Sequence, residues 1–193
     1  MKRQFWIGIG LICAALSGCA TRQLVATPLV ESRVGVKSYA EMSYQPLALN
    51  EARTIDFDAG TSPVARFPDG LGVYAPFSLD QQSKATTLRV RTWFSSTWLP
   101  LATVLKPYVM FLDADKRVVS NVESFESTDG STFMKGHYRQ TYFIVPSGAR
   151  FFILYSAASE SDRMILTAQT GKRWAIPNAY SGTVEVKHEV AHQ

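Results

Sequence analysis

The chain has 193 residues, and its 20 lysines and arginines stand against 16 aspartates and glutamates, which gives a formal net charge of +4. So small a surplus, without a cluster of basic residues, argues against a nucleic-acid partner, because phosphate binding needs gathered Lys and Arg side chains. The two cysteines are Cys13 and Cys19. The chain after residue 19 therefore has no disulfide, no thiol nucleophile and no cysteine-ligated zinc.

The amino terminus has the three parts of a secretory signal. Lys2 and Arg3 form the positive start, residues 5–16 form an apolar stretch too short to span a bilayer, and small residues follow it. The tetrapeptide at 16–19, Leu-Ser-Gly-Cys, resembles a bacterial lipobox. The resemblance implies that residues 1–18 are a lipoprotein signal peptide that is removed.

In lipoproteins with such a box, the cysteine receives a diacylglyceryl group and its new amino terminus is acylated, with chains such as palmitate. Three acyl chains exceed the two signals that stable anchoring requires. The residue after the cysteine is Ala20. An aspartate at this position would resemble an inner-membrane retention signal, and this chain does not have it. We therefore expect a lipid anchor on Cys19 and a location on the periplasmic face of the outer membrane. An ordinary secretory signal with a chance cysteine is the alternative.

Removal of the signal leaves 193 minus 18, or 175 residues, which suits one domain with a sizeable core. Residues 19–51 show little periodicity and predict a lipidated amino terminus and a tether. Within this segment we expect Ser38 to cap a single turn that runs to Met42, with Glu41 completing a capping box. Such a turn packs the terminus onto the domain.

Residues 52–193 show the pattern of short strands separated by turn signals. In residues 87–94 the positions 88, 90, 92 and 94 suit a core, whereas Arg89, Arg91 and Trp93 share the face nearer water. Strands are expected at 53–58, 87–94, 104–112, 117–125, 137–145, 150–157 and 183–190, with turns at 113–116, 127–131 and 146–148. A short helix is expected at 159–170. The predicted fold class is all-β: an antiparallel, jelly-roll-like β-sandwich of seven to eight strands.

Several segments resemble the maltose operon periplasmic protein family. The most distinctive is Ala-Gly-Thr-Ser-Pro-Val-Ala at 59–65, inside a segment at 55–67 that resembles the start of the family's β domain. Similar segments follow at 107–113, 142–145, 151–155 and 180–186, so the resemblance covers roughly residues 35–190. This chain differs in being shorter and in having the lipobox. The resemblance implies a periplasmic, non-enzymatic protein associated with maltose or maltodextrin uptake.

The histidines do not form a catalytic or metal-binding pattern. A Gly-x-Ser-x-Gly elbow, which a Ser-His-Asp hydrolase of the α/β type would need, does not occur. His188 and His192 lie four residues apart in a strand-like segment, where about 13 Å separates them, so we expect a solvated terminus and no shared metal. His137, at the start of a strand, is expected at the surface or hydrogen-bonded. We assign no catalytic residue, no metal and no other cofactor.

Two pairs of aspartates also have structural explanations. Asp113 and Asp115 resemble half of a calcium loop, but Lys116 follows where such a loop needs other residues, so a hairpin turn is expected. Asp56 and Asp58 could share one strand face, as a glycosidase requires, but nothing in the sequence around them points to a raised pKa. An enzyme is therefore the least favoured class.

Aromatic residues are the best binding candidates, because sugar rings stack on Trp and Tyr while sugar hydroxyls bind polar groups. Trp98 and Trp174 lie among Ser, Gly and Pro residues typical of loops, so we expect both to be exposed and to contact a glycan or a protein. The remaining candidates are expected in the core or in strand pairs: Trp93, Tyr108, Tyr138, Tyr142 and Tyr180.

The sequence thus predicts a non-catalytic, outer-membrane-anchored lipoprotein that binds a ligand or assists in carbohydrate uptake. The alternative is a structural lipoprotein that docks on another envelope protein complex.

Overall fold

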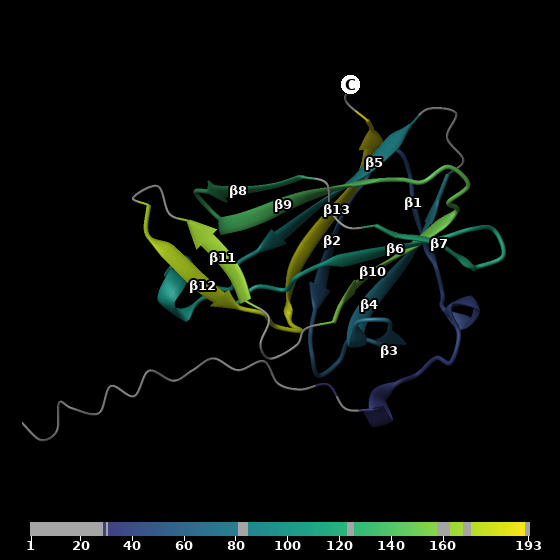
Figure 1. Ribbon diagram of the computed structural model, residues 1–193, viewed down its shortest axis with the longest axis horizontal. Coiled ribbons are helices and arrows are strands. Elements are labelled where there is room, and N and C mark those ends of the chain that lie inside the picture. The colour runs from purple at the N-terminus through teal and green to yellow at the C-terminus, as the bar shows by residue number, and fades with distance from the viewer. Residues whose placement is uncertain are drawn as a thin grey trace, which may run out of the picture.

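The computed structural model describes residues 29, 31–80, 85–122, 126–157, 163–167 and 171–191, which fold almost entirely as β-strands (Figure 1). In chain order the strands are β1 (Gln45–Leu47), β2 (Ala52–Phe57), β3 (Val64–Phe67), β4 (Gly70–Leu79), β5 (Thr86–Trp93), β6 (Tyr108–Leu112), β7 (Val118–Val122), β8 (Glu126–Thr132), β9 (Gly136–Ile144), β10 (Phe151–Ser156), β11 (Arg163–Thr167), β12 (Arg173–Pro177) and β13 (Gly182–Val190). The helical turns are η1 (Glu31–Arg33), η2 (Tyr39–Glu41) and η3 (Leu99–Leu101). The predicted all-β class is confirmed. Among the described residues, no helix is long and apolar enough to cross a membrane.

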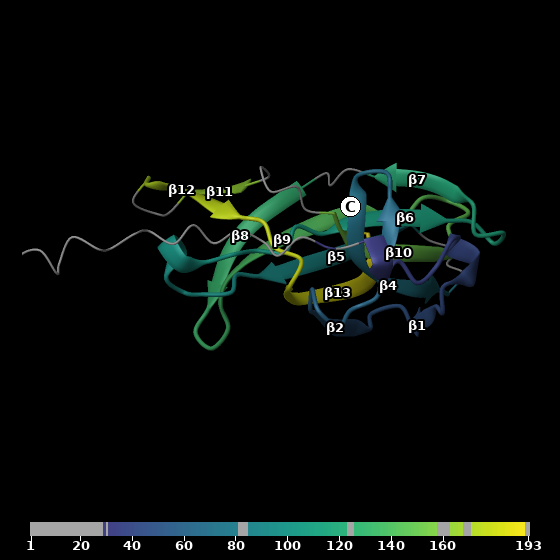
Figure 2. The same cartoon turned by 90° about the horizontal axis from the view of Figure 1, so that it is seen from below.

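The strands form two large sheets and one separate hairpin, which Figures 1 and 2 show from two directions. The six-stranded sheet has the order β1-β4-β10-β6-β7, with β3 also paired to β4, and the five-stranded sheet has the order β2-β13-β5-β9-β8. Strands β11 and β12 pair only with each other. The pairing is antiparallel except between β1 and β4, which run parallel. The expected sandwich is therefore present.

The inward faces of the two sheets enclose the main apolar core. Leu88 and Val90 of β5 are completely buried, as the alternation in residues 87–94 predicts. From the opposite sheet, the ring of Phe152 stacks on Phe77 with centroids 5.0 Å apart and lies 6.4 Å from Phe111. This trio links β4, β10 and β6 and makes Phe152 a central residue of the core.

The outer face of the six-stranded sheet carries a second apolar layer. The ring of Phe67 stacks on Tyr155 at 4.0 Å between centroids, and Tyr39 of η2 stacks on Phe67 at 6.1 Å. Burial, together with neighbouring Tyr74 and Tyr39, raises the pKa of Tyr44 to about 12. Segment 31–47, which belongs to the predicted tether, thus covers this face and adds β1 to the sheet.

The turn expected after Ser38 is present as η2. The Ser38 hydroxyl oxygen accepts a hydrogen bond from the Ala40 backbone N–H at 3.2 Å. Glu41 closes the turn by accepting from the backbone N–H of Lys37 at 2.9 Å, one residue before the donor of a standard capping box. The predicted cap is confirmed, and the reciprocal bond is shifted by one position.

Two sequence-based predictions of local structure are wrong. The helix expected at 159–170 is contradicted at residues 163–167, which form β11. The other residues of that range, 159–162 and 168–170, lie outside the described residues. Met164 and Leu166, two positions apart, pack on one small cluster, which is strand spacing. The turn expected at 127–131 is instead part of β8, an edge strand whose polar side chains resemble a loop in composition.

His188 corrects a third prediction, because it does not belong to a solvated terminus. It lies on the inward face of β13, opposite Leu88, and is 1 % exposed. Burial lowers the pKa of His188, while the backbone of Leu47 and the charge of Asp80 act in the opposite direction. His192 lies outside the described residues.

The lowered pKa predicts that acid destabilises the fold. An unfolded histidine has a pKa of about 6.5, so between that value and the lower folded pKa the unfolded chain binds the extra proton. The stability is therefore complete above about pH 6.5 and falls as the pH drops, by at most about 1.4 kcal/mol per pH unit. We expect urea unfolding between pH 8 and pH 5 to show this loss. His188→Leu should flatten the profile and His137→Gln should keep it; an unchanged slope in His188→Leu would rule out His188 as the cause.

Candidate functional site

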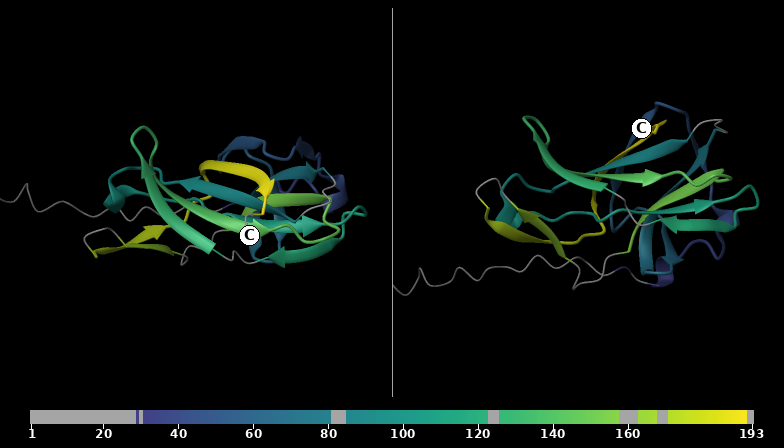
Figure 3. Two further views of the ribbon diagram at one scale, coloured as in Figure 1. Left: turned by 90° about the horizontal axis from the view of Figure 1, so that it is seen from above. Right: turned by 45° about the horizontal axis from the view of Figure 1, so that its top comes forward.

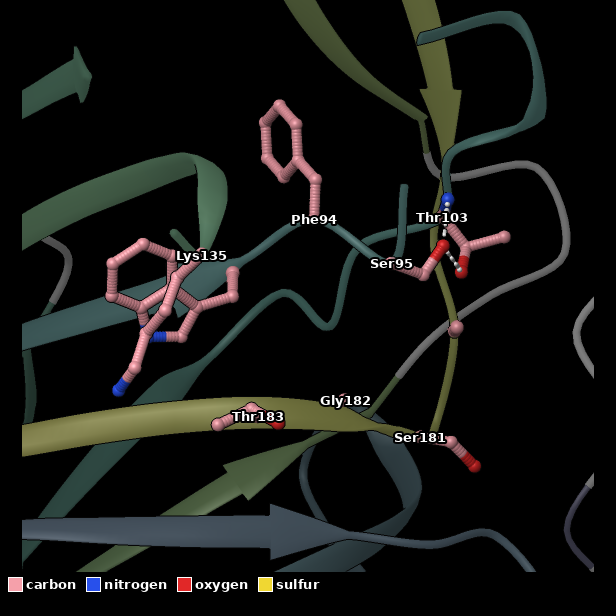
Figure 4. A pocket seen from close by; sticks show the side chains of 9 residues that line it. Phe94, Ser95, Thr103, Lys135, Ser181, Gly182 and Thr183 are labelled. Atoms are coloured by element: carbon pink, nitrogen blue, oxygen red, sulfur yellow. Dashed lines mark hydrogen bonds between the residues drawn. The ribbon is translucent and has the colours of Figure 1, made fainter. Parts of the chain in front are cut away.

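A cavity of about 570 Å³ opens where β5 ends and β13 begins (Figure 4). Its volume lies within the range of about 300–1,000 Å³ that small-molecule sites occupy. Its lining combines aromatic, hydroxyl and cationic side chains: Trp93, Phe94, Ser95, Thr103, Lys135, Ala179, Ser181, Gly182 and Thr183. We call this feature the end cavity. Its lining comes from four separate parts of the chain, which meet only in the fold.

The aromatic wall of the end cavity is Trp93, the last residue of β5. Alternation places it on the outer face of the five-stranded sheet, where it pairs with Tyr138 of β9, and their ring centroids lie 5.1 Å apart. Lys135, from the turn between β8 and β9, places its Nζ 5.3 Å from the centre of the Trp93 ring. Trp93 is 8 % exposed, and its indole Nε1 is buried without a hydrogen-bond partner.

Hydroxyl groups form the opposite part of the lining. The backbone N–H of Thr103 donates to Ser95 Oγ at 2.8 Å, and their hydroxyls lie 2.9 Å apart, as the dashed lines in Figure 4 mark. Ser181 Oγ accepts from the backbone N–H of Ala59 at 2.8 Å. Thr183 Oγ1 donates to Asp56 Oδ1 at 2.6 Å. Each hydroxyl is thus held in place, which preorganises the lining for a polar ligand.

A row of charged side chains continues from Trp93 across the same sheet face. Arg91 donates from Nη2 to Gln140 Oε1 at 2.8 Å, and its guanidinium lies 4.6 Å from the centre of the Tyr138 ring. Glu185 stands between two arginines, with its Oε1 3.6 Å from Arg91 and 3.7 Å from Arg89. Two cations share one carboxylate here, so the row has a surplus of hydrogen-bond donors beside the end cavity.

The arrangement supports binding chemistry. The exposed edge of the Trp93 indole, fixed hydroxyls and an ammonium can hold a ligand that has both an apolar side and many oxygens. In the part of the chain that the structure describes, no three His, Cys, Asp or Glu side chains gather as a metal site would require.

Trp98 and Trp174, the two tryptophans singled out in the sequence, have different environments. Trp98 precedes η3 and is 63 % exposed, so its predicted loop position is confirmed. Trp174 is not in a loop: it belongs to β12, is half-buried and packs on the cluster that includes Phe94 and Val104. Hydrophobic packing of the β11–β12 hairpin explains this difference. Neither tryptophan lines the end cavity. The elements next to Trp98 and around Trp174, η3 and β12, pack against each other.

The aspartates have structural partners. Asp58 Oδ1 accepts from the backbone N–H groups of Gly60 and Thr61, both at 2.8 Å, and a hydrogen bond from the Thr61 side chain is the main cause of its lowered pKa. Asp113 Oδ1 accepts from the backbone N–H groups of Asp115 and Arg117, both at 2.9 Å. The predicted hairpin turn after β6 is confirmed.

The alternation in residues 87–94 predicts the outer face of the sheet for Trp93, where it lies. The sequence predicts only strand pairing for this side chain and no part in a binding site. It gave no role to Lys135, Thr103 or Thr183. The alternation in 87–94 was the available signal for Trp93, whereas the approach of Lys135 depends on the β8 strand that the sequence did not reveal. Cys19, the predicted lipidation site, lies outside the described residues.

Comparison of this chain with family models, with curated proteins and with solved structures gives no match.

Proposed function

We propose that this protein is a non-catalytic lipoprotein, anchored through Cys19 on the periplasmic face of the outer membrane, that binds a carbohydrate such as a maltodextrin. The observation that carries the proposal is the end cavity, where Trp93 stands beside four hydroxyl side chains and Lys135. The lipobox-like sequence supports the location, and the resemblance to the maltose operon periplasmic family supports the class of ligand.

The chemistry of the lining supports a carbohydrate ligand. A sugar ring offers an apolar face that stacks on an indole, and its hydroxyls both donate and accept hydrogen bonds. The end cavity supplies the edge of an indole, hydroxyl groups that donate or accept hydrogen bonds, and an ammonium donor. Arg91 and Gln140 lie beyond Trp93 on the same face, so a second sugar unit of a longer chain would meet further donors and acceptors.

Lys135→Ala tests the site with little risk to the fold, because Lys135 is exposed and lies in a turn. We expect affinity for maltodextrins, measured by isothermal titration calorimetry, to fall about three- to tenfold, the loss of roughly one hydrogen bond. Lys172→Ala is the matched control, since Lys172 also places its Nζ over a tryptophan, 4.2 Å from the ring centre of Trp174, but outside the end cavity.

The control should bind like the unchanged chain. Equal affinities in Lys135→Ala, Lys172→Ala and the unchanged chain would place any bound glycan away from the end cavity. A loss confined to Lys172→Ala would move the site to the β11–β12 hairpin and support the earlier expectation for Trp174.

One observation favours a second candidate function, docking on another envelope protein. Trp98 is 63 % exposed and Leu101, in the same turn region, is 51 % exposed, and exposed aromatic residues are enriched in protein interfaces. Crosslinking in cells tests it: a partner captured by the unchanged chain and lost in Trp98→Ala supports docking, whereas a monomer in both cases contradicts it.

A further inference from the structure

The hairpin formed by β8 and β9 ends in an exposed apolar tip. In both panels of Figure 3 its turn extends away from the two sheets. Phe133 at this tip is fully exposed, and Met134 is 93 % exposed. Adjacent Phe and Met side chains without contact to the rest of the fold contribute nothing to the stability of the core, so another role must be considered.

Local hydrogen bonding fixes this turn. Thr132 and Gly136 form the last pair of the hairpin, and Thr132 Oγ1 accepts from the backbone N–H of Lys135 at 3.1 Å. Gly136 has a φ of +76°, which favours glycine, and a Cβ there would come within 2.8 Å of Thr97 Cγ2. The conformation of the turn is therefore fixed by local contacts, and it holds Phe133 and Met134 in solvent.

The tip is too small to hold a stable protein complex by itself. A buried aromatic side chain contributes about 150–250 Å², so two neighbouring side chains fall well short of the roughly 800 Å² per partner that a stable protein complex requires. A bilayer needs no matching pocket, because apolar side chains enter the boundary between headgroups and acyl chains.

The sequence of the tip and the expected anchor point to the same surface. From Gly130 to Tyr138 the chain has no acidic residue and contains Lys135, so anionic headgroups meet no like charge there. Leu29 already packs against the core, so residues 19 and 29 are 29 minus 19, or ten, positions apart, and ten extended residues reach about 35 Å. An anchor on Cys19 would thus keep the domain close to the bilayer and raise the effective concentration of the tip there.

We propose that the tip of the β8–β9 hairpin inserts Phe133 and Met134 into the lipid surface of the membrane, as a second contact beside the acyl anchor. The inference shares the membrane location with the proposed function and is independent of carbohydrate binding. The contact would also hold the end cavity near the membrane, since Lys135 belongs to both the turn and the cavity lining.

Vesicle flotation tests the insertion without the anchor. The chain from Ala20 onward keeps every residue that the structure describes, and the vesicles contain phosphatidylethanolamine and phosphatidylglycerol at a ratio of about 3:1. We expect the double variant Phe133→Ser/Met134→Ser to lower the bound fraction at least tenfold. The matched control is Val118→Ser/Val119→Ser, which removes two exposed apolar side chains of β7 (49 % and 41 % exposed) and should float like the unchanged chain.

Three results would overturn the proposal: no flotation of the unchanged chain, equal flotation of both double variants, or a crosslinked envelope protein that only the Phe133→Ser/Met134→Ser variant loses. The last of these would assign the tip to a protein partner. Calorimetry with maltodextrins on the same variants separates this outcome from the proposed function, because the tip variants are expected to keep glycan affinity.

Discussion

Replacing Cys19 by alanine is expected to move most of the protein from the membrane fraction to the soluble fraction, or to stop its processing. In the lipoproteins whose lipobox residues 16–19 resemble, the cysteine thiol is the acceptor of the diacylglyceryl group. Without it no acyl chain is attached, and each buried methylene lost removes about 0.8 kcal/mol of membrane affinity. Cell fractionation and intact mass of the product measure both consequences.

Cys13→Ala is the matched control for this change, because it removes the other cysteine from within the predicted signal peptide. It should leave the mass of the mature protein and its membrane location unchanged. The lipobox interpretation would be wrong if the Cys19→Ala product were processed and modified like the unchanged chain, with an intact mass that differs only by the substitution, and had the same membrane location. The hairpin tip alone should give weak, salt-sensitive attachment in the Cys19→Ala variant.

Replacing Phe152 by alanine is expected to cause the largest loss of stability from a single substitution described here. Phe152 is completely buried and contacts Phe77 and Phe111 from the neighbouring strands. Truncation of a buried phenylalanine costs about 3–5 kcal/mol, since it removes buried area and leaves a cavity. For a domain of this size the loss lowers Tm by about 6–20 °C.

Phe133→Ala makes the same substitution at a fully exposed position and should change the stability by less than about 0.5 kcal/mol. Calorimetric or circular dichroism melting of both variants compares them directly. Similar Tm values for Phe152→Ala and Phe133→Ala would mean that the packing between β4, β10 and β6 is not as described.

Some of the strands that the sequence revealed have one buried and one solvated face. Alternation in residues 87–94 predicted β5 because Leu88 and Val90 face the core and Arg89 and Arg91 do not. The apolar segments that became β6 and β10 were equally visible, since both faces of their sheet are covered.

The strands that were missed lie at edges or, like the central strand β4, contain glycine and proline residues that resemble a turn in sequence. Strand β8 is polar on both faces, and its Gly130 resembles a turn residue in sequence. The ring of Tyr138 lies over that glycine, where a Cβ would come within 2.4 Å of the ring, and such a cross-strand contact cannot be read from one segment alone. The sequence of β11 resembles a helix start, because acidic residues precede an apolar patch.

The end cavity was less predictable than the fold, because its lining is joined by tertiary pairing. The alternation gave the direction of Trp93, but the pairing of β13 with β5 brings Thr183 beside it, and the β8–β9 turn brings Lys135. Polar loop residues such as Ser95 and Ser181 have no distinctive signal in a single sequence. The local composition around Trp98 and Trp174 indicates loops and does not identify cavities.

The measurement that tests carbohydrate binding most directly is a thermal-shift series on the chain from Ala20 onward, with maltose, longer maltodextrins and unrelated glycans. A ligand at about 100 times its Kd adds roughly 2.7 kcal/mol of stability, which raises Tm by about 5–11 °C at this chain length. The proposal predicts such a rise with maltodextrins and none with the unrelated glycans. An unchanged Tm with every glycan at millimolar concentrations would contradict carbohydrate binding and would favour a protein partner.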